Sequence, residues 1–351
     1  MMRNTQNLRV AQLIPLTSPQ QLKIDQPISD VISETVAASR ETITRILQGT
    51  DPRFLAVVGP CSIHDEASAL DYARRLAPLA EKLADRLFVV MRVYFEKPRT
   101  TIGWKGLIND PHMDDTFDIE EGMRIARRLL LNIGALGLPA GTEMLEPVTP
   151  QYIDDLISWA SIGARTTESP THRQMASGLS MPVGFKNATD GNIDIAINAM
   201  SAASHPHSFL GIDDSGMTCV VRTTGNDAAH LILRGGRSGT NYDETSVRET
   251  IEKLEKAKLN TAITVDCSHA NSNKDYRRQH IVFRSVIEQH ATGNKRLVGA
   301  MIESNINEGA QKPSADKASL QYGVSVTDAC IGWEETERLL LWAHERLGQC
   351  A

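Results

Sequence analysis

The sequence predicts an α/β protein built as a (β/α)8 barrel, and three observations lead to this prediction. Eight short apolar runs rich in Val, Ile and Phe alternate with amphipathic stretches rich in Ala, Leu, Glu and Arg. These runs are apolar on both faces, as strands of a buried parallel sheet are. Each run also closes on a polar residue, and barrels collect their chemistry at strand ends. A doubly wound open sheet is the alternative, but no G-x-G-x-x-G follows the first strand.

The predicted elements follow in regular order within a barrel of residues 51–351. Strands are expected at 54–59, 87–93, 139–144, 161–165, 182–186, 230–234, 262–266 and 296–302. Helices are expected at 66–83, 119–131, 150–158, 191–203, 243–257, 274–289 and 334–347. The alternation favours parallel strands joined by helical crossovers.

Two segments lie outside this count. Residues 1–50 form a predicted arm, extended in its Pro/Gln-rich part and helical at 39–47, which packs on a neighbouring subunit or caps the barrel. An inserted pair of strands is expected at about 208–222, with Asp213-Asp214-Ser215-Gly216 as its turn. It falls between the fifth and sixth βα units.

Composition excludes several classes of protein. The 351 residues carry a net charge of −6, and the basic residues are local, which argues against nucleic acid as a partner. The five cysteines are odd in number and widely spaced, so no disulfide framework is expected. The N-terminus lacks the apolar core of a signal peptide, and no run has the length of a membrane span. A cytoplasmic protein without membrane contact is predicted.

Polar residues at the strand ends supply the candidate site. They are Cys61, Arg92 with Lys97, Glu143, Arg165, Lys186, Arg234, His269 and Glu303. Any one of them has an ordinary structural explanation, such as a strand-end arginine that reaches solvent. In a closed barrel they would converge on one narrow mouth.

One subset of these residues suits a metal. Cys61, His269 and Glu303, with Asp328 from a later loop, offer sulfur, nitrogen and oxygen donors. Such mixed sets favour a borderline divalent transition metal over Mg or Ca. Cys267 and Cys330 are rivals for the thiolate, but Gly59-Pro60 turns sharply and presents Cys61.

The other subset is cationic and consists of Arg92, Lys97, Arg165, Lys186 and Arg234. So many cations at one mouth would repel each other unless an anion of comparable charge bound there. Phosphoenolpyruvate, with a phosphate and a carboxylate, is such an anion. Arg99 and Thr100, beyond Pro98, could hold a second phosphate.

Taken together, the motifs closely resemble 3-deoxy-D-arabino-heptulosonate 7-phosphate (DAHP) synthase of the class I-alpha, amino-acid-regulated type, from about Leu8 to the C-terminal helix. The motifs are Gly59-Pro-Cys-Ser-Ile-His64, Met91-Arg-Val-Tyr-Phe-Glu-Lys-Pro-Arg-Thr-Thr101, Gly163-Ala-Arg-Thr-Thr-Glu168, Pro182-Val-Gly-Phe-Lys-Asn187, Leu233-Arg-Gly-Gly236, Asp266-Cys-Ser-His-Ala-Asn271, Met301-Ile-Glu-Ser304 and Thr327-Asp-Ala-Cys-Ile331. The resemblance implies a (β/α)8 barrel with an arm and an inserted strand pair. It also implies condensation of phosphoenolpyruvate with erythrose 4-phosphate, the first step toward chorismate.

The resemblance implies a role for each matching residue. Arg165 and Arg234, with backbone N–H groups near Gly163 and Ala164, would hold the phosphate of phosphoenolpyruvate. Arg92 and Lys186 would grip its carboxylate, and Lys97 would reach the reacting carbons. Pro98, Arg99 and Thr100 would hold erythrose 4-phosphate, and Glu143 would orient water. Cys61, His269, Glu303 and Asp328 would ligate one Mn, Fe, Co or Zn ion.

Feedback control is also implied by the resemblance. The matching effector site comprises Pro150, Gln151, Gly178, Leu179, Ser180, Phe209, Gly211 and Val221. Phenylalanine-responsive members carry serine at the position of Gly211, and the smaller glycine leaves room for a phenol oxygen. Tyrosine is therefore the expected inhibitor, with phenylalanine as the alternative, in a homodimer or homotetramer.

Two other functions remain open from the sequence. One is a phosphoenolpyruvate-dependent synthase for another aldose phosphate, such as arabinose 5-phosphate, against which the run Lys97-Pro-Arg-Thr-Thr argues. The other is a regulatory barrel without catalysis, which a missing metal ligand or phosphate cation would support. None of these residues is missing from the sequence.

Overall fold

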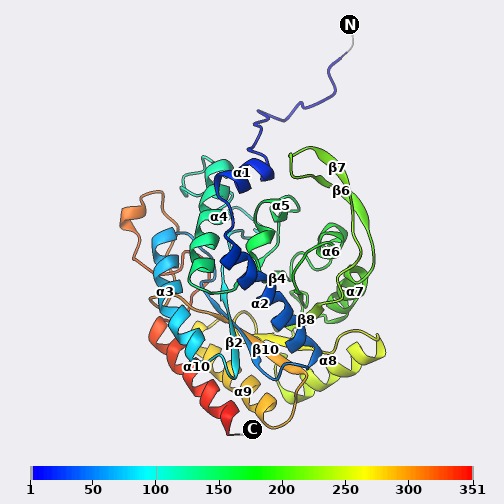
Figure 1. Ribbon diagram of the computed structural model, residues 1–351, viewed down its shortest axis with the longest axis vertical. Coiled ribbons are helices and arrows are strands. Elements are labelled where there is room, and N and C mark those ends of the chain that lie inside the picture. The colour runs from blue at the N-terminus through cyan, green and yellow to red at the C-terminus, as the bar shows by residue number, and fades with distance from the viewer. Residues whose placement is uncertain (1–2, 100, 350–351) are drawn as a thin grey trace.

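Eight parallel strands close into a barrel at the centre of a computed structural model that describes residues 3–99 and 101–349 (Figure 1). Their order around the barrel is β1-β10-β9-β8-β5-β4-β3-β2. The strands are β1 Phe54–Gly59, β2 Leu87–Arg92, β3 Ala140–Glu143, β4 Trp159–Ile162, β5 Val183–Lys186, β8 Ala229–Leu233, β9 Ile263–Asp266 and β10 Leu297–Glu303. Nearly every strand residue is buried, as runs that are apolar on both faces predict. The predicted fold is confirmed.

Helices follow the strands and surround them (Figure 1). They are α3 Glu66–Lys82, α4 Ile119–Ala135, α5 Pro150–Ile153, α6 Pro170–Ala176, α7 Asp194–Ala203, α8 Glu244–Lys256, α9 Gln279–Ala291 and α10 Trp333–Gly348. Three short 3-10 helices lie at Asp154–Leu156, Tyr276–Arg278 and Lys317–Ser319. Side chains of Asp65, Asp118 and Asp243 cap α3, α4 and α8 by accepting backbone N–H groups of the first turn. None of the helices in the described residues is long and apolar enough to span a membrane.

The N-terminal segment is more helical than the sequence suggested. Helix α1 spans Pro19–Asp25 and α2 spans Asp30–Gln48, where only 39–47 was expected to be helical. Ser18 and Ser29 cap the two helices. Ile43, Ile46 and Leu47 of α2 pack in one cluster with barrel residues from β1, β2, β4, β8 and β10, so α2 caps the barrel.

The segment before α1 projects away from the barrel in Figure 1. Leu8, Leu13 and Ile14 are each about two thirds exposed or more, at 69%, 77% and 71%. Such apolar exposure is typical of a surface that another surface covers.

The helix before β4 and the strand β4 itself both have other bounds than the sequence predicted. The helix expected at 150–158 ends at Ile153, because Arg40 donates to the carbonyls of Asp154 and Ile157 and the backbone of Ser158 already pairs with β3. The strand expected at 161–165 spans Trp159–Ile162. It stops there because Thr166 and Thr167 donate back to the carbonyl of Gly163 and form a turn.

Two further differences concern helices. Helix α6 follows β4 where no helix was expected. Helix α9 begins at Gln279 and not at 274, because Asn273 and Lys274 adopt a left-handed backbone conformation with φ of 55° and 60°.

The inserted strands form an antiparallel hairpin of β6 Ser208–Ile212 and β7 Thr218–Arg222, between α7 and β8. Its turn contains Asp213–Gly216 as predicted, with Gly216 at a φ of 81°. The hairpin curves toward α1 in Figure 1. There the carbonyl of Asp214 accepts the backbone N–H of Gln20, and its carboxylate pairs with Lys23.

Candidate active site

The strand ends place the predicted polar residues at one rim of the barrel. Arg92 ends β2, Glu143 ends β3, Lys186 ends β5 and Glu303 ends β10, while Arg234 directly follows β8. Because all eight strands are parallel, these carboxyl ends face the same mouth. The position in the sequence therefore determines on which end of the barrel each side chain lies.

One cavity at this mouth gathers most of the predicted site. It is lined by Arg92, Lys97, Pro98, Arg99, Glu143, Gly163, Ala164, Arg165, Lys186, Thr189, Arg234, His269, Thr327 and Asp328. Thr189 and Thr327 had not been predicted. Thr100 lies outside the described residues. The convergence expected from the strand ends is thus observed.

Three of the predicted metal ligands meet beside this cavity. The thiol sulfur of Cys61 and carboxylate oxygens of Glu303 and Asp328 all lie within 4.8 Å of one another. Cys61 and Glu303 are buried, whereas Asp328 is exposed. A sulfur donor beside two carboxylates suits a borderline divalent ion, so the residues present fit the expected metal.

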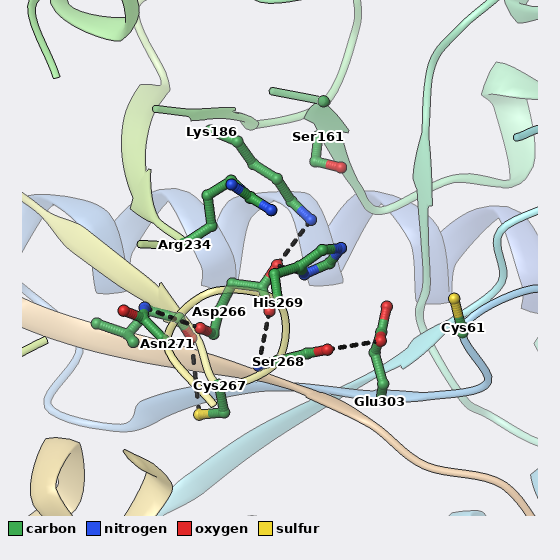
Figure 2. Close-up of polar contacts among 12 residues, drawn as sticks. Cys61, Ser161, Lys186, Arg234, Asp266, Cys267, Ser268, His269, Asn271 and Glu303 are labelled. Carbon is green, nitrogen blue, oxygen red and sulfur yellow. Dashed lines mark hydrogen bonds and ion pairs between the residues drawn. The ribbon is translucent and has the colours of Figure 1, made fainter. Parts of the chain in front are cut away.

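His269 borders this group without belonging to it. Its ring nitrogen Nδ1 lies 2.9 Å from Oδ2 of Asp266. His269 also has a φ of 55°, which is uncommon for a residue other than glycine. Strained backbone of this kind occurs at functional sites. Figure 2 shows the ring between Lys186 and Glu303.

The turn after β1 presents Cys61 as the sequence predicted. Gly59 has a φ of 154°, and a side chain there would come within 2.7 Å of the carbonyl oxygen of Arg92. Lys97 donates to the sulfur of Cys61 over 3.1 Å. Burial and the nearby Glu303 raise the pKa of the Cys61 thiol, and Lys97 opposes the shift.

The rival cysteines are engaged in other contacts. The thiol of Cys267 donates to the carbonyl of Val265 and that of Cys330 to the carbonyl of Asp328. Neither belongs to the group formed by Cys61 within the described residues. Figure 2 shows Cys267 directed away from Glu303.

Arg92 is held from several directions. Its Nη2 donates to Oε1 of Glu303 over 2.9 Å, and its Nε donates to the carbonyl of Pro60. The guanidinium also stacks on Tyr94, 3.6 Å from the ring centre. Nη1 is buried and has no hydrogen-bond partner within residues 3–99 and 101–349. Among these residues, nothing engages the Nη1 donors of Arg92, which lines the cavity.

A second buried ion pair joins Lys186 and Asp266. The ammonium of Lys186 donates to Oδ2 of Asp266 over 2.8 Å. Burial would raise the pKa of Asp266, but His269 and Lys186 outweigh it and hold that pKa well below its usual range. Ser268 completes the network, since its backbone N–H donates to Oδ1 of Asp266 and its hydroxyl donates to Oε2 of Glu303 (Figure 2).

The opposite side of the cavity is more open. Arg165 is exposed and Arg234 is half-buried. Burial and the charge of Arg165 lower the pKa of Arg234, and nearby carboxylates only partly offset this. A side chain at Gly163 would lie 2.3 Å from Oε1 of Glu143, so the glycine makes room for that carboxylate. Oε1 of Glu143 is itself buried and has no hydrogen-bond partner in the part of the chain that the structure describes.

The loop after β2 carries the second predicted phosphate site. Arg99 donates to the carbonyl of Trp104 within this loop. Lys97, Pro98, Arg99 and Arg165 also line a neighbouring, more open cavity. Arg99 therefore lies farther from the metal group than Lys97 along one continuous surface.

The predicted effector residues are spread over the hairpin, α5 and the loop after α6. Phe209 and Val221 face each other across β6 and β7, and a side chain at Gly211 would touch Val221 at 2.7 Å. Gly178 approaches Thr223 at the base of the hairpin. The remaining predicted residues are Leu179 and Ser180, which line a groove beside α2, and Pro150 and Gln151, which begin α5.

Sequence reasoning missed the residues that contact the predicted site residues and hold them in position. Asp266 and Ser268 precede His269 in one motif, and Tyr94 follows Arg92, yet none was assigned a role. Asp266 is a charged residue at the end of an apolar run, and that signal could have identified it. Tyr94 and Ser268 carry no comparable signal, because aromatic and hydroxyl side chains occur throughout such loops.

A model of the DAHP synthetase I family matches residues 24–341. The chain belongs to the DAHP synthetase I family. It is 55% identical over 346 residues to the Tyr-sensitive phospho-2-dehydro-3-deoxyheptonate aldolase of Salmonella typhimurium, covering 98% of this chain and 97% of that protein. It is 52% identical over 339 residues to the Phe-sensitive enzyme of Escherichia coli K12, covering 96% of each.

A solved structure agrees with this membership. The phospho-2-dehydro-3-deoxyheptonate aldolase of Francisella tularensis SCHU S4 superposes with a TM-score of 0.95 at 45% identity, covering 98% of this chain and 100% of that one. The DAHP synthetase I family thus accounts for the whole barrel and for the motifs that meet at its mouth.

Proposed function

We propose that this DAHP synthase condenses phosphoenolpyruvate with D-erythrose 4-phosphate and water to give DAHP and phosphate, the first step of the shikimate pathway. The observation that carries the proposal is the cavity lined by five predicted cations, with the group of Cys61, Glu303 and Asp328 beside it. Two anionic substrates and one electrophilic centre need this combination of charges.

A divalent ion, Mn, Fe, Co or Zn, is held by Cys61, Glu303 and Asp328, with His269 as the fourth ligand. When bound, such an ion supplies Lewis acidity toward an aldehyde oxygen. The donor set of the described residues fits it, since one sulfur and two oxygens already lie within 4.8 Å of one another.

The cations hold phosphoenolpyruvate by its two ends. Arg165 and Arg234, with the backbone at Gly163 and Ala164, bind the phosphate. On the opposite side, the free Nη1 of Arg92 and the ammonium of Lys186 bind the carboxylate. This arrangement fixes the C3 carbon of phosphoenolpyruvate toward the second substrate.

Erythrose 4-phosphate is bound through Pro98, Arg99 and Thr100. C3 of phosphoenolpyruvate attacks its aldehyde carbon, water adds at C2, and phosphate leaves with cleavage of the C–O bond. Lys97, beside Cys61, is placed to move a proton at the reacting oxygen. Glu143, whose Oε1 has no partner, orients the water.

Regulation and assembly complete the proposal. Tyrosine inhibits the enzyme by binding near Gly211 and Ser180, with phenylalanine as the weaker ligand. The arm of residues 1–50 packs on a neighbouring subunit in a cytoplasmic homodimer or homotetramer, whereas residues 51–351 form the catalytic unit. The exposed Leu8, Leu13 and Ile14 support this role of the arm.

The test is an assay of phosphoenolpyruvate loss with erythrose 4-phosphate or arabinose 5-phosphate as the second substrate. We expect turnover with erythrose 4-phosphate and little with arabinose 5-phosphate. Arg99→Ala should raise the KM for erythrose 4-phosphate and leave that for phosphoenolpyruvate nearly unchanged. Preference for arabinose 5-phosphate would assign another aldose phosphate, and no turnover with either would favour the non-catalytic barrel.

A further inference from the structure

Asp266 stands between the proposed metal and the proposed phosphoenolpyruvate carboxylate. It is fully buried at the end of β9. Its Oδ1 accepts the backbone N–H of Ser268 over 2.9 Å, which fixes the carboxylate plane. The side chains of Lys186 and His269 both approach the other oxygen, Oδ2 (Figure 2).

These two side chains share this oxygen. Lys186 donates a hydrogen bond to Oδ2 over 2.8 Å. Nδ1 of His269 lies 2.9 Å from Oδ2, yet this buried nitrogen has no well-aligned hydrogen bond within the described residues. The lysine therefore makes the better-aligned contact with Oδ2, and the histidine lies beside it.

A histidine that ligates a metal usually donates its other ring N–H to a carboxylate or carbonyl, which fixes the ring and makes it a better ligand. Asp266 is the carboxylate in place for this role. An anion bound by Lys186 would share the ammonium charge with Oδ2 and weaken the contact between Lys186 and Asp266. Oδ2 would then be a better acceptor for the ring N–H of His269.

Arg92 offers no equivalent connection. Within the described residues it donates to Pro60, Cys61 and Glu303, and none of these bonds reaches Asp266 or His269. The connection between the two ligands therefore runs through Asp266.

We propose, on the basis of the function assigned above, that Asp266 is a positioning residue through which phosphoenolpyruvate and the metal strengthen each other's binding. The carboxylate of phosphoenolpyruvate draws on Lys186, and Asp266 then holds His269 for the metal. By linkage, the metal must tighten phosphoenolpyruvate binding by the same factor.

The experiment titrates chelator-stripped protein with Co²⁺ and follows the absorption that a thiolate ligand gives to bound cobalt. Titrations are made without additive, with saturating phosphoenolpyruvate, and with inorganic phosphate. We expect phosphoenolpyruvate to lower the Kd for Co²⁺ by about 5-fold or more. Phosphate should leave it unchanged, because phosphate engages Arg165 and Arg234 but brings no carboxylate to Lys186.

Two variants locate the connection. Asp266→Asn should raise the Kd for Co²⁺ by about 10–100-fold, and phosphoenolpyruvate should no longer lower it. Ser268→Ala removes a hydrogen bond to Glu303 but keeps the backbone N–H that fixes Asp266. It should weaken Co²⁺ binding and retain the effect of phosphoenolpyruvate.

Several results would overturn the inference. They are an unchanged Kd for Co²⁺ in the presence of phosphoenolpyruvate, an equal effect of phosphate, or a full effect in Asp266→Asn. If that variant fails to fold by circular dichroism, the comparison of phosphoenolpyruvate with phosphate in the unaltered protein decides. Failure of the unaltered protein to bind Co²⁺ or phosphoenolpyruvate at all would instead contradict the proposed function.

Discussion

The two sides of the mouth differ in how their cations are balanced. On the side of the metal group, Arg92 and Lys186 are buried, and each lies within 2.9 Å of a carboxylate oxygen. On the opposite side, Arg165 and Arg234 are more exposed, and no carboxylate lies at ion-pair distance from either within residues 3–99 and 101–349.

The difference shows that the two sides of the mouth are suited to different groups of a ligand. Buried charges are tolerated when they are paired and hydrogen-bonded, so the paired side is positioned before any ligand arrives. Unpaired arginines near solvent await a multiply charged anion, and a phosphate supplies it. We expect ligand removal and mutation to affect the two sides in different ways.

Metal removal should have the largest effect. Chelation should abolish the condensation, and Mn²⁺, Fe²⁺ or Co²⁺ should restore it, because Lewis acidity toward the aldehyde is lost with the ion. The measurement is phosphoenolpyruvate loss before and after metal is added back. Full activity in metal-free protein would contradict the assignment of Cys61, Glu303 and Asp328.

Glu303→Ala should destabilise the fold. It leaves Arg92 buried without its carboxylate, and breaking such a pair costs about 3–5 kcal/mol of unfolding free energy. Denaturant unfolding of the metal-free protein measures this. Asp328→Ala is the matched control, since that ligand is exposed and its loss should change stability by only about 0.5 kcal/mol. Equal stabilities of the two variants would show that the buried pair of Arg92 with Glu303 does not stabilise the fold.

Arg234→Ala should behave in the opposite way. It should weaken phosphoenolpyruvate binding by about 2–5 kcal/mol, the range for losing one partner of a close charge pair, without lowering stability. Arg237→Ala, a neighbouring exposed arginine, serves as the control in the same binding titration. If Arg234→Ala unfolded the protein as Glu303→Ala does, Arg234 would belong to the paired side.

The contrast between paired and unpaired charges also applies to two buried glutamates. Burial raises the pKa of Glu303, but Arg92, His269 and Lys97 outweigh it and lower that pKa. Glu96, next to Lys97, is equally buried but has no cation at ion-pair distance within the described residues. Burial and the nearby Glu146 raise the pKa of Glu96 to about 8.

Glu96→Gln should therefore change the pH dependence of stability. An unfolded glutamate ionises near pH 4.5 and the folded Glu96 near pH 8, so the folded state binds more protons between these values. Stability should fall as pH rises through this window, and Glu96→Gln should reduce the fall. Unfolding curves at pH 5, 6.5 and 8 test the sign, and an identical slope in the variant would show that Glu96 is ionised.

Gly211→Ser should have the smallest effect, because it lies outside the mouth. A side chain there meets Val221 at 2.7 Å and reduces the space near the hairpin. The preference for tyrosine over phenylalanine should shift by about 10-fold toward phenylalanine. Leu210→Ser, on the other face of β6, is the control. An enzyme insensitive to both amino acids would contradict the effector site itself.

Much of this architecture could be predicted from sequence because the strands are apolar on both faces and close on polar residues. Trp159–Ile162 was the exception, since hydrogen bonds from Arg40 end the preceding helix, and Arg40 is more than a hundred residues away in sequence. The first half of α2, residues 30–38, was also missed, although Ser29 caps it and Ile32 and Val36 follow at helical spacing.

The sequence by itself determined the barrel and the end of it at which the chemistry lies, because a parallel strand always presents its carboxyl end at the same rim. Only the tertiary structure decided which charges are paired. Lys186 meets Asp266 across 80 positions, and Arg92 meets Glu303 across 211. Closure of the barrel brings the two charged groups of each pair together, and burial makes a partner necessary for each charge. The pattern of residues along the chain shows neither this proximity nor this burial.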